Sequence, residues 1–224
     1  MSTQNRFRDR RDAGRQLGVR LSQLQAEHPI VLGLARGGVP VAFEVARALA
    51  SPLDVLVVRK LGVPFHTELA FGAIGEEDTR VLDTEMIQRL GLSRKRVKAT
   101  IERERIELTR RVELYRSNRT ALELLGRTVI VVDDGLATGA TARVALEIAR
   151  TRGAEKIIVA IPVSPPPETI AELKGLAVEV ISLQVPLGFL AVGEWYDDFT
   201  QTTDDEVTSL LRRSSIKETG RDTD

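Results

Sequence analysis

The 224-residue sequence contains no cysteine and only two histidines, His28 and His66. Disulfide bonds, thiol chemistry and thiolate metal sites are therefore excluded, and a metal centre built from several histidines is not expected. No apolar run approaches the roughly 18–20 residues that a membrane-spanning helix needs. The first ten residues also lack the apolar segment of a signal peptide. We therefore expect a cytoplasmic protein whose chemistry depends on carboxylates, hydroxyls, Arg, Lys and backbone groups.

An excess of charge of one sign is also missing. The 32 Lys and Arg residues are balanced by 32 Asp and Glu residues, which argues against a general polyanion binder but does not exclude a local basic face. Hydrophobic residues make up 42% of the chain and charged residues 29%, a composition typical of a folded protein with a buried core.

Short, continuous apolar runs recur along the chain and predict strands that are buried on both faces of a parallel sheet. These runs cover residues 30–35, 54–59, 128–132, 157–161 and 178–181. Helices are predicted over residues 6–20, 39–50, 141–152 and 168–173. The order of strands and helices indicates an α/β fold with a doubly wound, mainly parallel sheet flanked by helices.

Two regions depart from this pattern. Residues 62–82 contain three Gly residues and one Pro and are predicted to form a hood or loop with a small antiparallel hairpin. Residues 93–119 are predicted to form a long inserted helix with ten Arg and Lys residues against four Glu residues. Its apolar residues lie near one face, so we expect that face to pack on the core. A basic lid or an RNA-facing surface is the alternative.

The chain is interpreted as one domain over residues 1–212. Residues 213–224 have no apolar pattern and are predicted to be a disordered tail.

The most specific chemical signal is the segment VIVVDDGLATGAT, from Val129 to Thr141. A buried strand leads directly to two adjacent carboxylates, at the sheet edge where ligands bind in open parallel sheets. The glycines permit a close approach of the backbone, and the hydroxyls and the N–H groups of the following helix can hold a phosphate. The paired carboxylates suit sugar hydroxyls or a divalent cation. Together these features predict a site for a phosphorylated ribose, whereas Asp-Asp-Gly alone would be an ordinary strand-end turn.

This segment resembles the signature with which type I phosphoribosyltransferases bind 5-phosphoribosyl 1-pyrophosphate (PRPP), and the resemblance extends over most of the chain. It implies a pentosyltransferase of nucleotide metabolism that uses PRPP and Mg²⁺. Such an enzyme displaces pyrophosphate from ribose C1 with a nitrogen of a base and forms a nucleotide. The expected transition state resembles an oxocarbenium ion, so Asp133 and Asp134 are expected to be the catalytic residues.

The resemblance also implies the roles of further residues. The ribose and its 5′-phosphate would be bound by Asp133, Asp134, Gly135, Leu136, Ala137, Thr138, Gly139, Ala140 and Thr141. Pyrophosphate would be bound by Arg36, Gly37, Gly38, Arg59 and Lys60. The base would be bound by Phe189 and Trp195, and the metal by Asp134 and Asp197. Each of these features also has an ordinary structural explanation. The Arg36–Gly38 segment could be a common turn, and Arg59 and Lys60 could extend into solvent. Phe189 and Trp195 could be core residues.

The acceptor base is less well specified than PRPP. Enzymes of the hypoxanthine/guanine type usually carry an acidic residue where this chain has Ala137, and a Lys just after the next strand. Here that strand leads into residues 162–167, which contain no Lys. We therefore expect PRPP and some other nitrogenous base as the substrates.

Two alternatives belong to other functional classes. One is a regulator that senses PRPP or nucleotides and binds RNA through residues 93–119, and the other is a catalytically degenerate ribose-phosphate module. A homodimer is expected, whereas a membrane and nucleic acid are not expected partners.

Overall fold

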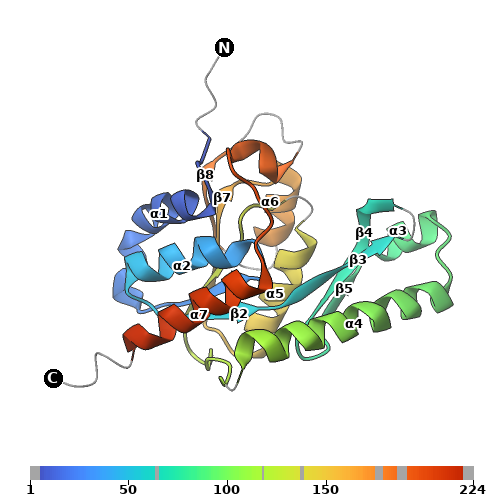
Figure 1. The fold of residues 1–224 in the computed structure, drawn as a ribbon. Coiled ribbons are helices and arrows are strands. Elements are labelled where there is room, and N and C mark those ends of the chain that lie inside the picture. The colour runs from blue at the N-terminus through green and yellow to red at the C-terminus, as the bar shows by residue number, and fades with distance from the viewer. Residues whose placement is uncertain are drawn as a thin grey trace, which may run out of the picture.

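The computed structural model describes residues 6–63, 66–117, 119–136, 139–174, 179–185 and 191–218. Its main sheet has five strands in the order β2-β1-β6-β7-β8, and every neighbouring pair is parallel (Figure 1). The strands are β1 (Ile30–Leu34), β2 (Leu53–Leu56), β6 (Thr128–Val132), β7 (Lys156–Val163) and β8 (Glu179–Gln184). The predicted α/β fold with a mainly parallel sheet is therefore confirmed.

Helices cover both faces of this sheet (Figure 1). Within β6, Ile130 and Val132 pack in one apolar cluster, and Val129 and Val131 pack in a second. This alternation explains the continuous apolar run, because successive side chains of a strand point to opposite faces. The first cluster includes residues of α1 (Arg10–Arg20), α2 (Gly38–Leu49) and α7 (Asp204–Glu218). The second includes residues of α5 (Ala140–Thr151) and α6 (Pro167–Lys174).

A second, antiparallel sheet projects to one side of the main sheet (Figure 1). Its strands are β3 (Val58–Val63), β4 (His66–Gly75) and β5 (Arg80–Leu82), and two helices follow, α3 (Thr84–Arg89) and α4 (Arg94–Arg116). We call residues 58–116 the arm. The predicted hairpin is present, with a third strand added to it.

The predicted strand 54–59 is in fact two strands. The parallel pairing of β2 ends at Leu56, and the backbone N–H of Val57 donates to the buried carboxylate of Glu76 at 3.0 Å. This side-chain acceptor takes the place of a ladder partner at the point where the chain leaves the main sheet. Arg59 and Lys60 therefore lie in β3 of the arm and not at the end of a main-sheet strand.

The long charged segment is helical, as predicted. Ser93 caps the start of α4, where its hydroxyl accepts a hydrogen bond from the Arg96 N–H. Ile101, Leu108 and Tyr115 are buried and belong to the first apolar cluster. The apolar face of α4 is thus packed on the protein, which confirms the main interpretation of this segment.

The ends of the chain differ from the prediction. The first helix begins at Arg10, because the Asp9 side chain caps it by accepting from the Asp12 N–H at 2.7 Å. At the other end, α7 continues to Glu218, so the predicted tail over 213–224 is wrong for its first part. Buried Val207 and Leu210 anchor this helix to the core, and no Gly or Pro interrupts it before Glu218.

Two short 3₁₀ helices, η1 (Ser22–Glu27) and η2 (Val192–Trp195), complete the described elements. None of the helices in the described part of the chain is long and apolar enough to cross a membrane.

Candidate active site

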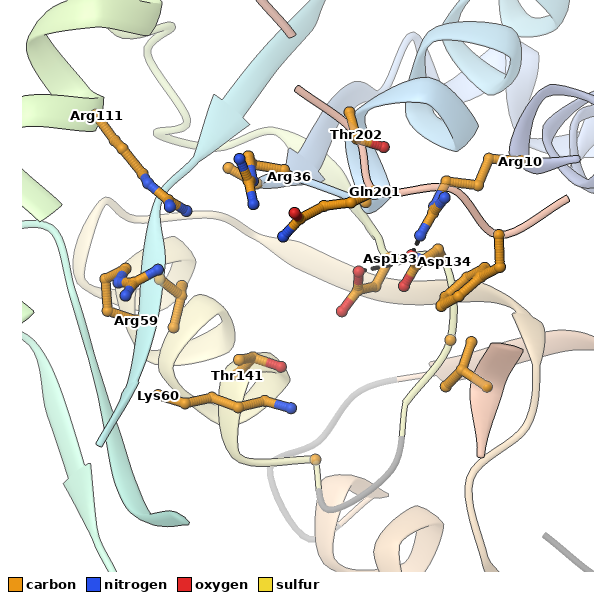
Figure 2. Close-up of a pocket in the computed structure, with 17 residues that line it drawn as sticks. Arg10, Arg36, Arg59, Lys60, Arg111, Asp133, Asp134, Thr141, Gln201 and Thr202 are labelled. Atoms are coloured by element: carbon orange, nitrogen blue, oxygen red, sulfur yellow. Dashed lines mark hydrogen bonds and ion pairs between the residues drawn. The ribbon is translucent and has the colours of Figure 1, made fainter. Parts of the chain in front are cut away.

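A cavity of about 550 Å³ lies at the carboxyl ends of β1 and β6, beside the first residues of β3 (Figure 2). Its polar lining consists of Arg10, Arg36, Arg59, Lys60, Arg111, Asp133, Asp134, Thr141, Gln201 and Thr202. Five cationic side chains thus face a pair of carboxylates in one enclosure. The location is the one that the parallel-sheet rule predicts for a ligand.

Asp133 and Asp134 follow directly after β6. The Asp134 N–H donates to Asp133 Oδ1 at 2.9 Å, and Arg10 Nε donates to Asp134 Oδ2 at 2.8 Å. The Tyr196 hydroxyl donates to the Asp134 carbonyl oxygen at 2.6 Å. Among the contacts of the described residues, these bonds fix the pair while engaging one oxygen of each carboxylate. Both residues also line the cavity, so the pair is accessible to a ligand.

The two carboxylates affect one another. Burial, reinforced by the neighbouring Asp134 carboxylate, raises the pKa of Asp133 well above its usual value of 3.8. The positive charge of Lys60 acts in the opposite direction. The pair therefore favours a ligand that brings positive charge or hydroxyl donors close to the two carboxylates.

The loop after β1 packs directly on the acid pair. A Cβ atom on Gly37 would overlap Asp134 Oδ2, and one on Gly38 would lie 2.6 Å from the Val132 carbonyl oxygen. Only glycine allows this close approach. The peptide bond between Ala35 and Arg36 is cis. The predicted Arg-Gly-Gly turn is thus next to the predicted acid pair, although Gly38 itself does not line the cavity.

The loop between β6 and α5 forms another part of the wall. Gly135, Gly139 and Thr141 line the cavity, whereas Leu136 and Ala140 are buried beside it. Gly139 has a φ of +69°, in the left-handed region that favours glycine, and is the N-cap of α5. The free N–H groups and the positive dipole end of α5 suit a phosphate at this place. The predicted residues Ala137 and Thr138 lie outside the described residues.

The predicted pyrophosphate residues Arg36, Arg59 and Lys60 all line the cavity (Figure 2). Arg36 Nη1 lies 3.6 Å from Asp204 Oδ1. Arg59 donates twice to Glu104 Oε2, at 3.0 and 2.7 Å, so much of its guanidinium is already engaged. Lys60 is exposed and is close enough to Asp133 to affect its pKa.

Two of the residues predicted for the base and the metal, Trp195 and Asp197, do not line the cavity. Trp195 is buried in a small cluster with Phe7 and Tyr196, which corresponds to the core alternative. Asp197 is exposed, because the extended backbone turns Tyr196 inward and its neighbour outward. Phe189 lies outside the described residues. Asp197 is therefore not placed to share a metal with Asp134.

Several lining residues were missed by sequence reasoning. Phe199 lines the cavity, and the Arg10 guanidinium lies 3.9 Å from the centre of its ring. Arg10 and Arg111 come from two charged helices in which many other cations face solvent, so no local pattern marks them. Val192 lies between the predicted base residues Phe189 and Trp195 but was not itself predicted, and Gln201 and Thr202 come from a polar segment without a motif. Long-range packing alone selects these residues.

The carboxylates of the cavity suit an Mg²⁺ ion that is bound partly by the protein and partly by the substrate. Among the described residues, no group of three Asp, Glu, His or Cys side chains could form a protein cage. Mg²⁺ is commonly held by one or two carboxylates together with substrate phosphates and water. Asp133 and Asp134, which both line the cavity, could provide such a partial site.

Comparisons with known proteins indicate the family of the chain. A family model described as the phosphoribosyl transferase domain matches residues 11–192. A curated protein of Mycobacterium tuberculosis, named "Putative phosphoribosyl transferase Rv0571c", is 52% identical over 208 residues. That match covers 93% of this chain but 47% of the relative, so the chain spans about half the length of the curated relatives that it matches.

Solved structures agree with the fold. The chain is 43% identical to TT1426 from Thermus thermophilus, with a TM-score of 0.76 and coverage of 93% of this chain and 98% of that one. The AQ2163 protein from Aquifex aeolicus is 14% identical, with a TM-score of 0.50 and coverage of 79% of this chain and 74% of that one. This second likeness supports the fold alone.

Proposed function

The chain belongs to the phosphoribosyl transferase family, and we propose that it transfers the phosphoribosyl group of PRPP to a nitrogen of a base. The observation that carries this proposal is the convergence of three elements on one cavity. They are the acid pair Asp133–Asp134, the Gly139 start of α5, and the cationic group that includes Arg36 and Lys60. These elements are complementary to ribose hydroxyls, a 5′-phosphate and a pyrophosphate.

In the proposed reaction the bond from ribose C1 to the pyrophosphate oxygen breaks, and a bond from C1 to the base nitrogen forms. Asp133 and Asp134 accept hydrogen bonds from the ribose hydroxyls and stabilise the positive charge that develops on the ring. The N–H groups at the start of α5, together with Thr141, hold the 5′-phosphate and so position C1. Arg36 and Lys60 neutralise the charge on the departing pyrophosphate.

Mg²⁺, held by Asp133 and Asp134 with substrate oxygens, would supply additional positive charge to the pyrophosphate. The proton that the base loses has no evident acceptor among the side chains that line the described cavity, apart from the acid pair itself. A base that reacts as its anion, or that loses its proton to water, would not need one.

For the acceptor, we propose a base other than hypoxanthine or guanine. After β7 the chain continues with buried Ser164, whose hydroxyl donates to the Pro165 carbonyl oxygen at 3.0 Å. This position therefore provides no Lys and no unengaged hydroxyl to donate to a 6-oxo group. A site without that donor loses the specificity that such a hydrogen bond provides.

The deciding experiment is a turnover assay with PRPP, Mg²⁺ and a panel of purine and pyrimidine bases, in which released pyrophosphate is measured. We expect turnover with at least one base, and slow or no turnover with hypoxanthine and guanine. Efficient turnover of guanine, with kcat/KM near the roughly 10⁴–10⁸ M⁻¹s⁻¹ of ordinary enzymes, would contradict the proposed acceptor but support the proposed transfer.

One observation favours a second candidate, a module that binds PRPP without transferring it. Arg10 neutralises Asp134 at 2.8 Å and so places a positive charge near the ribose ring, where positive charge must develop. Tight binding of PRPP combined with no turnover across the whole panel would favour this candidate.

A further inference from the structure

The long helix α4 contributes one side chain to the cavity, Arg111. Its side chain is only 11% exposed, although most of this helix carries its charges into solvent. Neither the Val129–Thr141 segment nor the loop after β1 includes α4, so no motif predicts this contact. The position of Arg111 therefore calls for an argument from its own surroundings.

Arg111 is held by one end of its guanidinium. Its Nε donates to Glu107 Oε1 at 2.7 Å, one helical turn away. Glu107 also accepts two bonds from Arg110, at 2.8 and 2.9 Å. These two arginines lower the pKa of Glu107 to about 2, so its carboxylate remains charged at neutral pH. The tether orients Arg111 while its two terminal nitrogens face the cavity (Figure 2).

A second carboxylate joins this helix to the loop after β1. Asp204, at the start of α7, accepts from Arg110 at 2.8 Å and from the Tyr115 hydroxyl at 2.6 Å. The same carboxylate lies 3.6 Å from Arg36. Asp204 therefore fixes α4 relative to Arg36, and Figure 2 shows Arg36 and Arg111 on the side of the cavity opposite Arg10.

We propose that Arg111 is a substrate-binding residue that contacts the terminal phosphate of the pyrophosphate group of PRPP. This inference rests on the proposed function. The pyrophosphate begins at ribose C1, near the acid pair, and its terminal phosphate is the part that can reach furthest from that pair. Arg111 lies across the cavity from the acid pair (Figure 2). Its two terminal nitrogens present the paired donors that match phosphate oxygens.

Arg59 is less suited to this role, although it lines the same side of the cavity. Two of its nitrogens donate to Glu104, at 3.0 and 2.7 Å, whereas Arg111 uses only Nε in its bond to Glu107. A phosphate can therefore engage both terminal nitrogens of Arg111 without breaking its tether.

The test compares Arg111→Ala with Arg105→Ala by titration calorimetry in the presence of Mg²⁺. Arg105 is on the same helix but pairs with Asp78 at 2.9 Å and does not line the cavity. The probes are PRPP, inorganic pyrophosphate and ribose 5-phosphate. Loss of a charge-assisted contact should weaken binding of the first two by about 10- to 100-fold. Binding of ribose 5-phosphate should stay within about twofold, and Arg105→Ala should leave all three unchanged.

The outcomes separate this inference from the proposed function. If the wild-type protein binds PRPP and Arg111→Ala binds it equally well, the role of Arg111 is wrong and the proposed function stands. If the wild-type protein does not bind PRPP, the proposed function itself fails. An equal loss of ribose 5-phosphate binding would reveal a general structural defect and would also overturn the assignment.

A second variant, Arg111→Met, keeps the apolar stem of the side chain and covers the case in which the alanine variant does not fold. Melting temperatures establish that each variant is folded. The expected pattern for Arg111→Met is the same selective loss of PRPP and pyrophosphate binding, and its absence in a folded variant would overturn the assignment.

Discussion

Asp133 combines a functional position with an unfavourable environment for its charge. Since the folded protein raises the pKa of Asp133 above its usual 3.8, the folded state binds the proton more tightly than the unfolded chain. The contribution of Asp133 to the free energy of unfolding is therefore most favourable below its pKa in the unfolded chain. That contribution is lost as the pH rises through the higher pKa of the folded protein. Where this group is ionised in the folded protein, its charge opposes folding, which is typical of residues kept for function.

The first prediction follows from this sign. Asp133→Asn should raise the melting temperature by a few degrees at pH 8, because it removes the repulsion with Asp134 and the cost of burying a charge. The difference should shrink towards pH 4, where Asp133 is protonated in the wild-type fold. Thermal unfolding of both proteins from pH 4 to pH 8 measures this, and a difference that does not change with pH would contradict it.

The same pair provides the second prediction, on activity. Replacing Asp133 and Asp134 with Asn should leave the fold intact, because amide oxygens can still accept the bonds from Arg10 and the Asp134 N–H. Turnover should fall by about 10²- to 10³-fold or more, since the charge that stabilises the ribose ring is lost. If the folded double variant turns over like the wild type, the catalytic assignment of the pair is wrong.

The third prediction concerns the glycine that packs on the acid pair. Gly37→Ala should destabilise the protein by about 1–3 kcal/mol and weaken PRPP binding, because the added Cβ overlaps the Asp134 carboxylate. Gly62→Ala is the matched control, since the nearest atom to its Cβ is the Leu69 carbonyl oxygen at 4.0 Å. Urea unfolding and PRPP titration of both variants should separate the two positions, and equal behaviour would contradict the close approach.

At the scale of elements, the junction between the main sheet and the arm depends on Glu76. Its buried carboxylate accepts from the Val57 N–H at 3.0 Å and pairs with Arg116 at 2.7 Å and Arg152 at 2.9 Å. These partners belong to the break between β2 and β3, to the last residue of α4 and to the C-cap of α5. One side chain therefore connects the arm to the helix that begins at the proposed phosphate site.

The fourth prediction tests this connection. Glu76→Gln should destabilise the protein by about 3 kcal/mol, because it leaves two largely buried guanidinium groups without the negative charge that they share. Glu77→Gln, next to it in the chain, removes only a half-exposed partner of Arg152 and should cost less than about 1 kcal/mol. Urea unfolding measures both, and similar losses for the two variants would show that Glu76 is not the joining residue.

The same junction explains which elements could be predicted from the sequence. The strand Thr128–Val132 was predicted at its observed bounds and helix Ala140–Thr151 to within one residue, because local apolar runs and glycines determine both. The break at Val57 could not be predicted, because its acceptor is 19 residues away along the chain. Trp195 could not be assigned either, because its partner Phe7 lies at the other end of the chain. Interactions that are distant in sequence decide such positions.

At the scale of the whole molecule, the cavity gathers parts that are far apart in the chain. Arg10 comes from the first helix, Lys60 and Arg111 from the arm, and Gln201 from the segment before α7. A ligand that contacts all of them would link the arm to the main sheet. It would therefore stabilise the molecule globally and reduce local opening of the arm.

The last prediction uses this linkage. PRPP with Mg²⁺ at about 100 times its dissociation constant should add about 2.7 kcal/mol to the free energy of unfolding. For a chain of this length that corresponds to a rise in melting temperature of about 5–11 °C.

Hydrogen exchange should slow at the cavity end of the arm, in β3 and around Arg111. It should change little in α3, none of whose residues line the cavity. Ribose 5-phosphate is the control, because without a pyrophosphate it should slow exchange near Gly139 but not around Arg111. If millimolar PRPP with Mg²⁺ shifts neither the melting temperature nor the exchange of the arm, the cavity is not a PRPP site. A shift in melting temperature without protection of the arm would place PRPP on the main sheet alone.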